Sequence, residues 1–301
     1  MRLALMIEGQ EGVTWDDWLA LAATCEEHGI DTMFRSDHYL SGGEPEGREA
    51  TDAWTLIGAL AARTERLRLG TLVSPVTFRH PAVLAKAVVT ADHVSGGRVE
   101  LGMGTGWMDA EHEAYGIPFP PMKMRVAMLA GQIETVHRHW TDEPRIQPKP
   151  VQQPHPPLLV GGSGLSGTID PAARFADEYN TVTASPKECA EPCEKLARAC
   201  EREGRDPIPL SVMTGCAIGV DEAEARERVR RRLERSGQQV DPDDYVRERG
   251  EKLVVGTVEQ AAERLRALED AGVERVMLQH LDHRDLEMVA LIGRELAPAV
   301  A

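Results

Sequence analysis

The sequence lacks an excess of positive charge, because 34 lysine and arginine residues stand against 49 aspartate and glutamate residues, a net charge of −15. With no basic stripe to offset this charge, nucleic acids and anionic membrane surfaces are not expected partners. No apolar run approaches the length of a membrane span, and the first residues hold an apolar stretch too short for a secretory signal. A small-molecule partner remains open, since a binding site needs only local positive charge.

Cysteine is also scarce, and its five residues make an odd set. Such a set predicts free thiols and a cytoplasmic protein rather than a disulfide framework. The chain contains neither a CxxC pair nor an HExxH motif, so no metal site is expected.

Strand-like and helix-like segments alternate from one end of the chain to the other. Eight strands are expected close to residues 2–8, 31–38, 66–74, 98–104, 156–162, 179–184, 208–219 and 273–280. Eight such units without a break in composition predict an α/β fold, a (β/α)8 TIM barrel in which residues 1–301 form a single domain. A doubly wound open sheet is the alternative, and it would more often show a seam between domains.

Two segments depart from the repeat and are interpreted as insertions. Residues 141–156 are proline-rich and polar, and residues 236–252 are polar and lie near the last units. Long insertions in a compact fold are often lids, and a solvated spacer explains either segment as well.

Polar and glycine residues gather where the predicted strands end, which in a TIM barrel is the functional face. His38 follows the second strand in FRSDHY, where a histidine can exchange protons near neutral pH or hydrogen-bond the barrel rim. The GGSG segment, residues 161–164, ends the fifth strand; it could bind a phosphate through backbone N–H groups or be a plain turn.

Three alternating glycines, Gly102, Gly104 and Gly106, end the fourth strand and resemble a dinucleotide-binding loop. The third glycine comes one residue too early for that motif, and no acidic residue ends a strand about twenty residues on. A Rossmann site is therefore not expected. Glycines at a strand end also remove side chains, so that a flat ring system can lie against the backbone.

Four stretches of the chain, residues 34–40, 67–120, 148–164 and 256–279, resemble the luciferase-like monooxygenase superfamily. More narrowly, they resemble its branch that uses the deazaflavin coenzyme F420. The resemblance implies a TIM barrel that binds the ring at its mouth, with a cis peptide bond between Leu72 and Val73 pressing against the ring. It implies that Asp37 and His38 lie beside the ring, that Gly104, Thr105 and Gly106 lie close to the cofactor, and that Gly161, Gly162, Ser163 and Gly164 contact its phosphate.

The family's sugar-phosphate dehydrogenases carry a glutamate directly after the fourth-strand glycines, where this chain has Trp107. Glucose 6-phosphate chemistry is therefore not expected. The resemblance favours hydride transfer between C5 of the deazaflavin and a small organic substrate, with His38 as proton donor or acceptor and Asp37 orienting it. The alternatives are an FMN-dependent monooxygenase and a flavin-binding protein without catalytic activity.

Six further residues are candidates for the substrate pocket, although a rim or packing role explains each of them: Glu8, His80, Trp107, Glu111, His112 and His280. The pocket is expected to be largely apolar with a few polar anchors. Members of the family often form dimers, so a homodimer is compatible with the resemblance.

Overall fold

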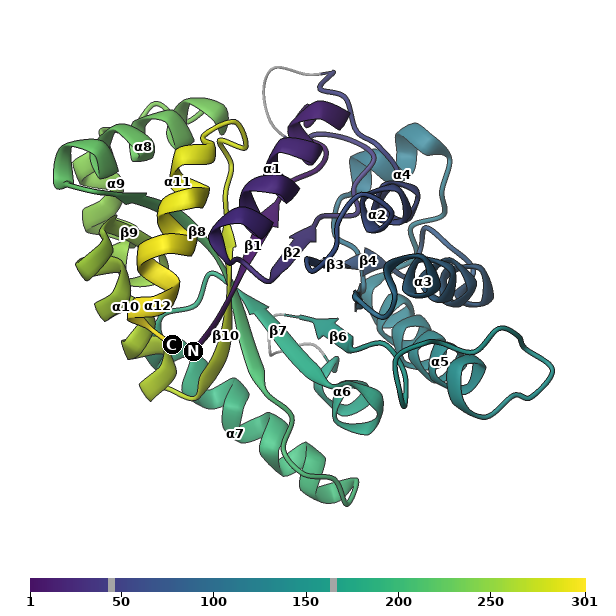
Figure 1. Cartoon of the computed structure of the whole chain (residues 1–301). Helices are drawn as coiled ribbons and strands as arrows, with labels where there is room; N and C mark the ends of the chain where they lie inside the picture. The colour runs from purple at the N-terminus through teal and green to yellow at the C-terminus, as the bar shows by residue number, and fades with distance from the viewer. Residues whose placement is uncertain (43–46, 163–166) are drawn as a thin grey trace.

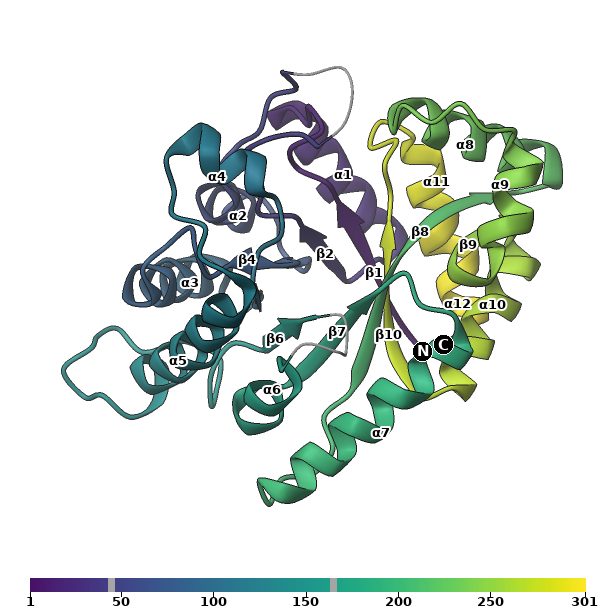
Figure 2. The ribbon, with the colours of Figure 1, turned by 180° about the vertical axis from the view of Figure 1, so that it is seen from behind.

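The computed structural model describes residues 1–42, 47–162 and 167–301. Eight parallel strands follow one another in the order β1, β2, β3, β5, β6, β7, β8 and β10, and β10 pairs with both β8 and β1. The sheet is thereby closed, and helices surround it in both views (Figures 1 and 2). The predicted TIM barrel is confirmed.

The strands of the barrel are short and agree with the predicted segments. They are β1 (Arg2–Ile7), β2 (Thr32–Arg35), β3 (Arg68–Thr71), β5 (Val99–Gly104), β6 (Leu158–Gly161), β7 (Glu178–Val182), β8 (Leu210–Gly219) and β10 (Val273–Gln279). Two further strands were not expected. β4 (Ser74–Pro75) pairs with the end of β5, and β9 (Val254–Thr257) pairs with the outer end of β8.

Helices connect the strands. They are α1 (Trp15–His28), α2 (Ala53–Ala61), α3 (Pro81–Ser95), α4 (Asp109–Tyr115), α5 (Met122–Thr141), α6 (Ile169–Phe175), α7 (Pro186–Arg202), α8 (Glu222–Arg235), α9 (Pro242–Arg249), α10 (Val258–Asp270), α11 (Leu286–Leu291) and α12 (Ala297–Ala299), with the short helices η1 (Gly250–Lys252) and η2 (Ile292–Leu296). Helix α1 illustrates how the sequence fixes the two ends of a helix. Thr14 and Asp17 form a capping box, and Gly29 ends the helix at φ 83°.

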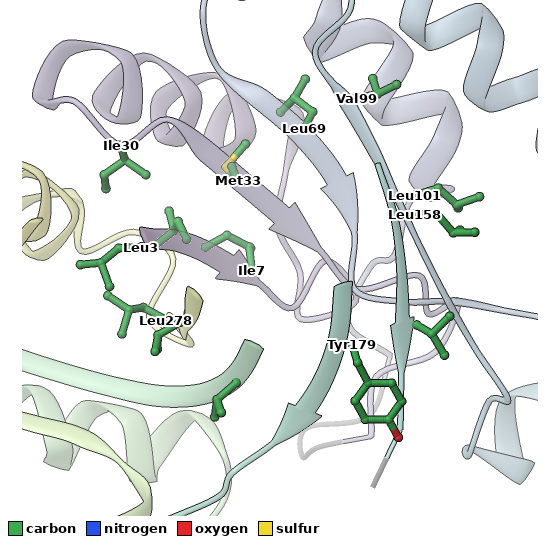
Figure 3. Packing of buried hydrophobic residues seen from close by; sticks show 14 of the residues in the cluster. Leu3, Ile7, Ile30, Met33, Leu69, Val99, Leu101, Leu158, Tyr179 and Leu278 are labelled. Carbon is green, nitrogen blue, oxygen red and sulfur yellow. The ribbon is translucent and has the colours of Figure 1, made fainter. Parts of the chain in front are cut away.

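The two faces of each strand pack differently, as the alternation in β1 illustrates. Leu3 and Ile7 belong to a large cluster between the strands and the helices, whereas Ala4 and Met6 belong to a smaller one that includes Phe34. Figure 3 shows part of the larger cluster, with labelled side chains from several neighbouring strands. The barrel interior is therefore a packed core and not a channel.

The barrel interior also contains buried ions. Arg275 of β10 lies 2.9 Å from Glu100 of β5 and 2.8 Å from Glu178 of β7, and all three side chains are almost fully buried. The Arg275 guanidinium stacks over the ring of Phe34 at 5.0 Å. The inward face of the strands is thus partly ionic, with each charge facing one of opposite sign.

The two predicted insertions differ in position. In residues 141–156, the backbone N–H of Val151 bonds Asp92 of α3, and Gln152 donates to the carbonyl of Val99 at the amino end of β5. This segment therefore packs outside the barrel, away from the carboxyl ends of the strands. Residues 236–252 contain α9 and η1, and Ser236 lies at the mouth of the barrel.

None of the helices in the described ranges combines the length and the apolar character needed to cross a membrane.

Candidate active site

The carboxyl end of β2 brings His38 against a carboxylate from α4. His38 Nδ1 lies 2.9 Å from Glu111 Oε1, and the backbone N–H of Tyr39 donates to Glu111 Oε2 at 3.1 Å. The Glu111 side chain is 1% exposed and that of His38 15%. Because a carboxylate only accepts, Nδ1 carries the proton, and Nε2 is the ring nitrogen that Glu111 does not engage.

The charge state of His38 follows from this contact. Burial disfavours the imidazolium ion, but the hydrogen bond and negative charge of Glu111, assisted by Glu8 and Asp37, outweigh burial and raise the pKa of His38 above its usual value. The side chain is therefore suited to hold and release a proton around neutral pH.

Asp37 was predicted to orient His38, but its carboxylate hydrogen-bonds other residues. Its carboxylate accepts hydrogen bonds from Ser74 Oγ at 2.7 Å and from the Arg79 guanidinium at 2.5 Å and 3.2 Å. Arg79 also pairs with Asp52, whose pKa is lowered to about 2 because hydrogen bonds and the Arg79 charge outweigh the opposing effect of burial. Asp37 thus anchors the loop after β2, and Glu111 takes the orienting contact with His38 that was expected of Asp37.

The peptide bond between Leu72 and Val73 is cis, as predicted. The Val73 side chain occupies the space that glycines leave open. A Cβ added at Gly104 would lie 2.4 Å from Val73 Cγ2, and one at Gly161 would lie 3.0 Å from Val73 Cγ1. At Gly102 an added Cβ would meet the carbonyl oxygen of Thr71 at 2.1 Å. The absence of side chains at these glycines therefore makes room for the backbone and the Val73 side chain after β3. Val73 itself remains partly exposed.

At the other two described glycines of the mouth, Gly106 and Gly162, the local backbone or the neighbouring side chains require glycine. Gly106 has φ 75°, a left-handed conformation that turns the chain from β5 toward α4. Thr105 beside it is partly exposed. At Gly162 a Cβ would lie 2.4 Å from both Thr168 Oγ1 and Tyr179 Oη. Ser163 and Gly164, which were predicted to contact phosphate, lie outside the described residues.

A cavity of about 270 Å³ opens at the mouth. Its lining consists of Glu8, Gln10, Glu11, Gly42, Arg48, Trp107, Met108, Arg235, Ser236 and Leu281. Glu8 accepts hydrogen bonds from Gln279 at 2.6 Å and Gln10 at 3.0 Å. Trp107 is 67% exposed, and its ring lies nearly perpendicular to the His38 ring, with centroids 5.4 Å apart. The cavity therefore lies beside the His38–Glu111 pair.

Two of the predicted pocket residues, Glu8 and Trp107, line this cavity. His80 is instead an exposed N-cap of α3. His112 is buried, with Thr77 Oγ1 at 2.7 Å from one ring nitrogen and the carbonyl of Met108 at 2.7 Å from the other, so both of its nitrogens are used in packing α4.

His280 is also buried, and burial lowers its pKa to about 3. Its place is behind the mouth, in a small space that it shares with Arg228 and Met288. The described residues that line the mouth cavity thus include neither His80, His112 nor His280.

Several residues of the cavity were missed from the sequence. Gln10 and Glu11 lie within three residues of Glu8, just after the first strand, so their place at a strand end could have identified them. Arg235 comes from the far end of α8 and donates to the carbonyl of Leu281 at 3.0 Å. No local pattern places a residue of an outer helix at the mouth.

Comparison with known proteins gives two informative relatives. An uncharacterized protein of Mycobacterium tuberculosis is 33% identical over 221 residues, which cover 64% of this chain and 77% of the relative. An F420-dependent glucose-6-phosphate dehydrogenase of Amycolatopsis mediterranei is 27% identical, over 94% of this chain and 93% of the relative.

Solved structures share the fold over the whole chain. A monooxygenase from Streptomyces bottropensis superposes with a TM-score of 0.83 at 23% identity, covering 100% of both chains. The coenzyme F420-dependent tetrahydromethanopterin reductase of Methanopyrus kandleri has a TM-score of 0.76 at 18% identity, and a type II Baeyer–Villiger monooxygenase of Pseudomonas putida in complex with FMN has 0.78 at 17%; each match covers 100% of this chain and 99% of the other.

The family model for luciferase-like monooxygenases matches residues 2–275, from the first strand of the barrel into the last. This chain therefore belongs to the luciferase-like monooxygenase family.

Proposed function

We propose that this chain is an F420-dependent oxidoreductase that moves a hydride between C5 of the deazaflavin and a small organic substrate. The observation that carries the proposal is the His38–Glu111 pair, with Glu111 fully buried and His38 partly exposed, beside a cavity lined by Glu8 and Trp107. Similarity over most of the chain to a dehydrogenase named as F420-dependent supports the choice of cofactor.

The residues at the mouth suit a flat ring. Val73, Thr105, Gly106, Gly161 and Gly162 are all partly exposed at the ends of neighbouring strands. Most of them carry little or no side chain, so a planar group can approach the backbone there. When bound, the deazaflavin supplies the carbon that accepts or gives the hydride.

His38 has the properties of the proton-transferring residue. Glu111 holds Nδ1 at 2.9 Å and fixes the direction of the ring, which leaves Nε2 for a substrate oxygen. In the direction of reduction, Nε2–H donates a proton to the oxygen that becomes a hydroxyl; in the direction of oxidation, Nε2 accepts the proton that the hydroxyl loses. The Trp107 ring lies beside the His38 ring in an edge arrangement, with the centroids 5.4 Å apart.

The cofactor is tested by titrating the purified protein with oxidised F420 and with FMN, and by following the fluorescence of each. We expect saturable binding of F420 and much weaker binding of FMN. Tight FMN binding without F420 binding would refute the proposal in favour of an FMN-dependent monooxygenase. Stoichiometric F420 binding without turnover of any alcohol, aldehyde or ketone would indicate a carrier of the cofactor.

The proton-transferring role is tested with His38→Ala and Glu111→Gln, and Glu113→Gln on the exposed side of α4 is the matched control. We expect His38→Ala to bind F420 normally and to lose about 10²–10⁴-fold in kcat. In Glu111→Gln the carboxylate that raises the pKa of His38 is gone, so the inflection of the kcat profile should move to lower pH. An unchanged profile in this variant, or normal turnover in His38→Ala, contradicts the assignment.

A further inference from the structure

A second and larger cavity lies outside the barrel, between α8, α9, β9 and the start of α10. Its volume of about 570 Å³ is within the range of sites for small molecules. The described residues that line it and those that line the mouth cavity have no member in common. We call it the α8–α10 chamber; part of its wall comes from α9, which lies in the predicted insertion 236–252.

The floor of the α8–α10 chamber is apolar. Ala225 and Val229 of α8 and Leu253 before β9 are buried, and Val246 and Val255 are partly exposed beside them. An apolar surface of this extent is stabilised by a hydrocarbon or aromatic group that displaces water from it.

Three arginines, Arg226, Arg247 and Arg264, also line the chamber, and they differ in their partners. Arg226 bonds Asp243 at 2.8 Å, and Arg247 pairs with Asp244 at 2.7 Å. These two cations are already neutralised by carboxylates on α9.

Arg264 of α10 is different. Its Nε and Nη2 are shielded from solvent, and neither has a hydrogen-bond partner among the described residues. Burial lowers the pKa of Arg264, and the negative charge of Glu251 offsets part of that effect. Nε and Nη2 form one edge of the guanidinium, which matches the two oxygens of a carboxylate, so a ligand acid would satisfy both donors at once.

We infer that the α8–α10 chamber binds a small amphipathic carboxylate, with its apolar body on the Val229 and Leu253 floor and its carboxylate on Arg264. Arg264 lines the chamber while its unpaired edge is shielded from solvent, so ligand binding requires its long stem to rotate until this edge meets the ligand. The chain carries a net charge of −15, and an anion therefore needs such a local cation to be held. The site is independent of the proposed chemistry at the mouth.

The test uses octanoate as the ligand, with octan-1-ol and octylamine as probes of the same length, in calorimetric titrations of the full chain. We expect octanoate to bind, octylamine not to bind, and octanol to bind more weakly. Arg264→Gln should weaken octanoate by about tenfold or more, since a hydrogen bond to a charged group is lost. Arg266→Gln, on the same helix and outside the chamber, is the matched control and should bind as the parent does.

A second variant guards against misfolding of the first. Val246→Trp places a large ring into the chamber from α9 and should abolish octanoate binding while leaving the circular dichroism spectrum and F420 binding unchanged. Octanoate binding that survives both variants, or that F420 displaces, places the ligand at the mouth and overturns the inference. Absence of saturable octanoate binding in the millimolar range overturns it as well, whatever the protein does with F420.

Discussion

Replacing Arg275 with methionine tests the buried ionic cluster inside the barrel. The guanidinium is 2.9 Å from Glu100 and 2.8 Å from Glu178, and each of the three side chains is no more than 5% exposed. Without Arg275, Glu100 keeps Arg68 at 2.7 Å, whereas Glu178 keeps the largely exposed Arg2 at 3.5 Å and a hydrogen bond with Ser211. The variant therefore leaves the buried Glu178 carboxylate without a buried cation beside it.

The magnitude follows from that imbalance. Removing one partner of a buried ion pair costs about 3–5 kcal/mol in the free energy of unfolding, because the other charge stays buried and unpaired. For a chain of 301 residues the unfolding entropy near the midpoint is about 0.6 kcal/mol per kelvin. The loss should therefore lower Tm by about 5–8 °C.

The assay is urea unfolding of Arg275→Met at pH 7 and at pH 5. Burial already raises the pKa of Glu178, and Arg275 is the charge that most opposes this rise. In the variant the native state binds a proton at Glu178 more tightly than the unfolded state, so its stability falls as pH rises above the unfolded pKa. The free energy of unfolding that Arg275→Met loses relative to the parent should therefore be larger at pH 7 than at pH 5.

Two further variants distinguish the effect of an unpaired buried charge from the effect of lost packing at position 275. Arg275→Met combined with Glu178→Gln removes the buried charge and should recover part of the loss at pH 7. Arg2→Met removes a 55% exposed cation from the same carboxylate and should cost less than about 1 kcal/mol. A loss that is the same at both pH values and that Glu178→Gln does not reduce would refute the account.

Three other predictions concern the barrel and its mouth. Gly104→Ala sets a Cβ 2.4 Å from Val73 Cγ2 and should lose about 1–3 kcal/mol in urea unfolding, whereas Gly58→Ala, with open space around it, should not be destabilised. His280 has a native pKa of about 3, so stability is lost as pH falls below about 6.5, and His280→Leu should flatten that loss between pH 7 and pH 5. Trp107→Ala should leave Tm unchanged because the ring is 67% exposed, and a large fall in Tm would indicate a packing role.

Much of the fold is predictable because it depends on local patterns. Thr14 caps α1 and Gly29 ends it, and threonine and glycine are residue types that mark these helix positions in a sequence. The strand β9 was missed because its four residues precede a helix without a break, and only the outer end of β8, far away in the chain, makes them a strand. Such pairing is tertiary information that a short apolar run does not contain.

In the candidate site, too, contacts between residues far apart in the chain could not be read from local patterns. His38 is found from its place after a strand, but its partner Glu111 lies 73 residues further on. The sequence presented Glu111 only as a polar residue near the mouth. The buried ions did leave a signal, since Glu100, Glu178 and Arg275 are charged residues within strands that are otherwise buried. Charges of opposite sign at inward positions of alternate barrel strands, here β5, β7 and β10, predict pairing inside a barrel.

The segment from β5 to α4 ties the shape of the mouth to its chemistry. Gly104 lies against the Val73 side chain, so its lack of a side chain allows the segment after β3 to pack close to β5. Gly106 then turns the chain at φ 75°, which carries Trp107 to the edge of His38 and begins the helix that delivers Glu111 to its Nδ1. The surface that suits a flat ring and the residue pair that suits proton transfer are therefore positioned by one short stretch of backbone. A shift of that stretch would displace both together, so we expect binding of a flat ring at this surface to be coupled to the protonation of His38.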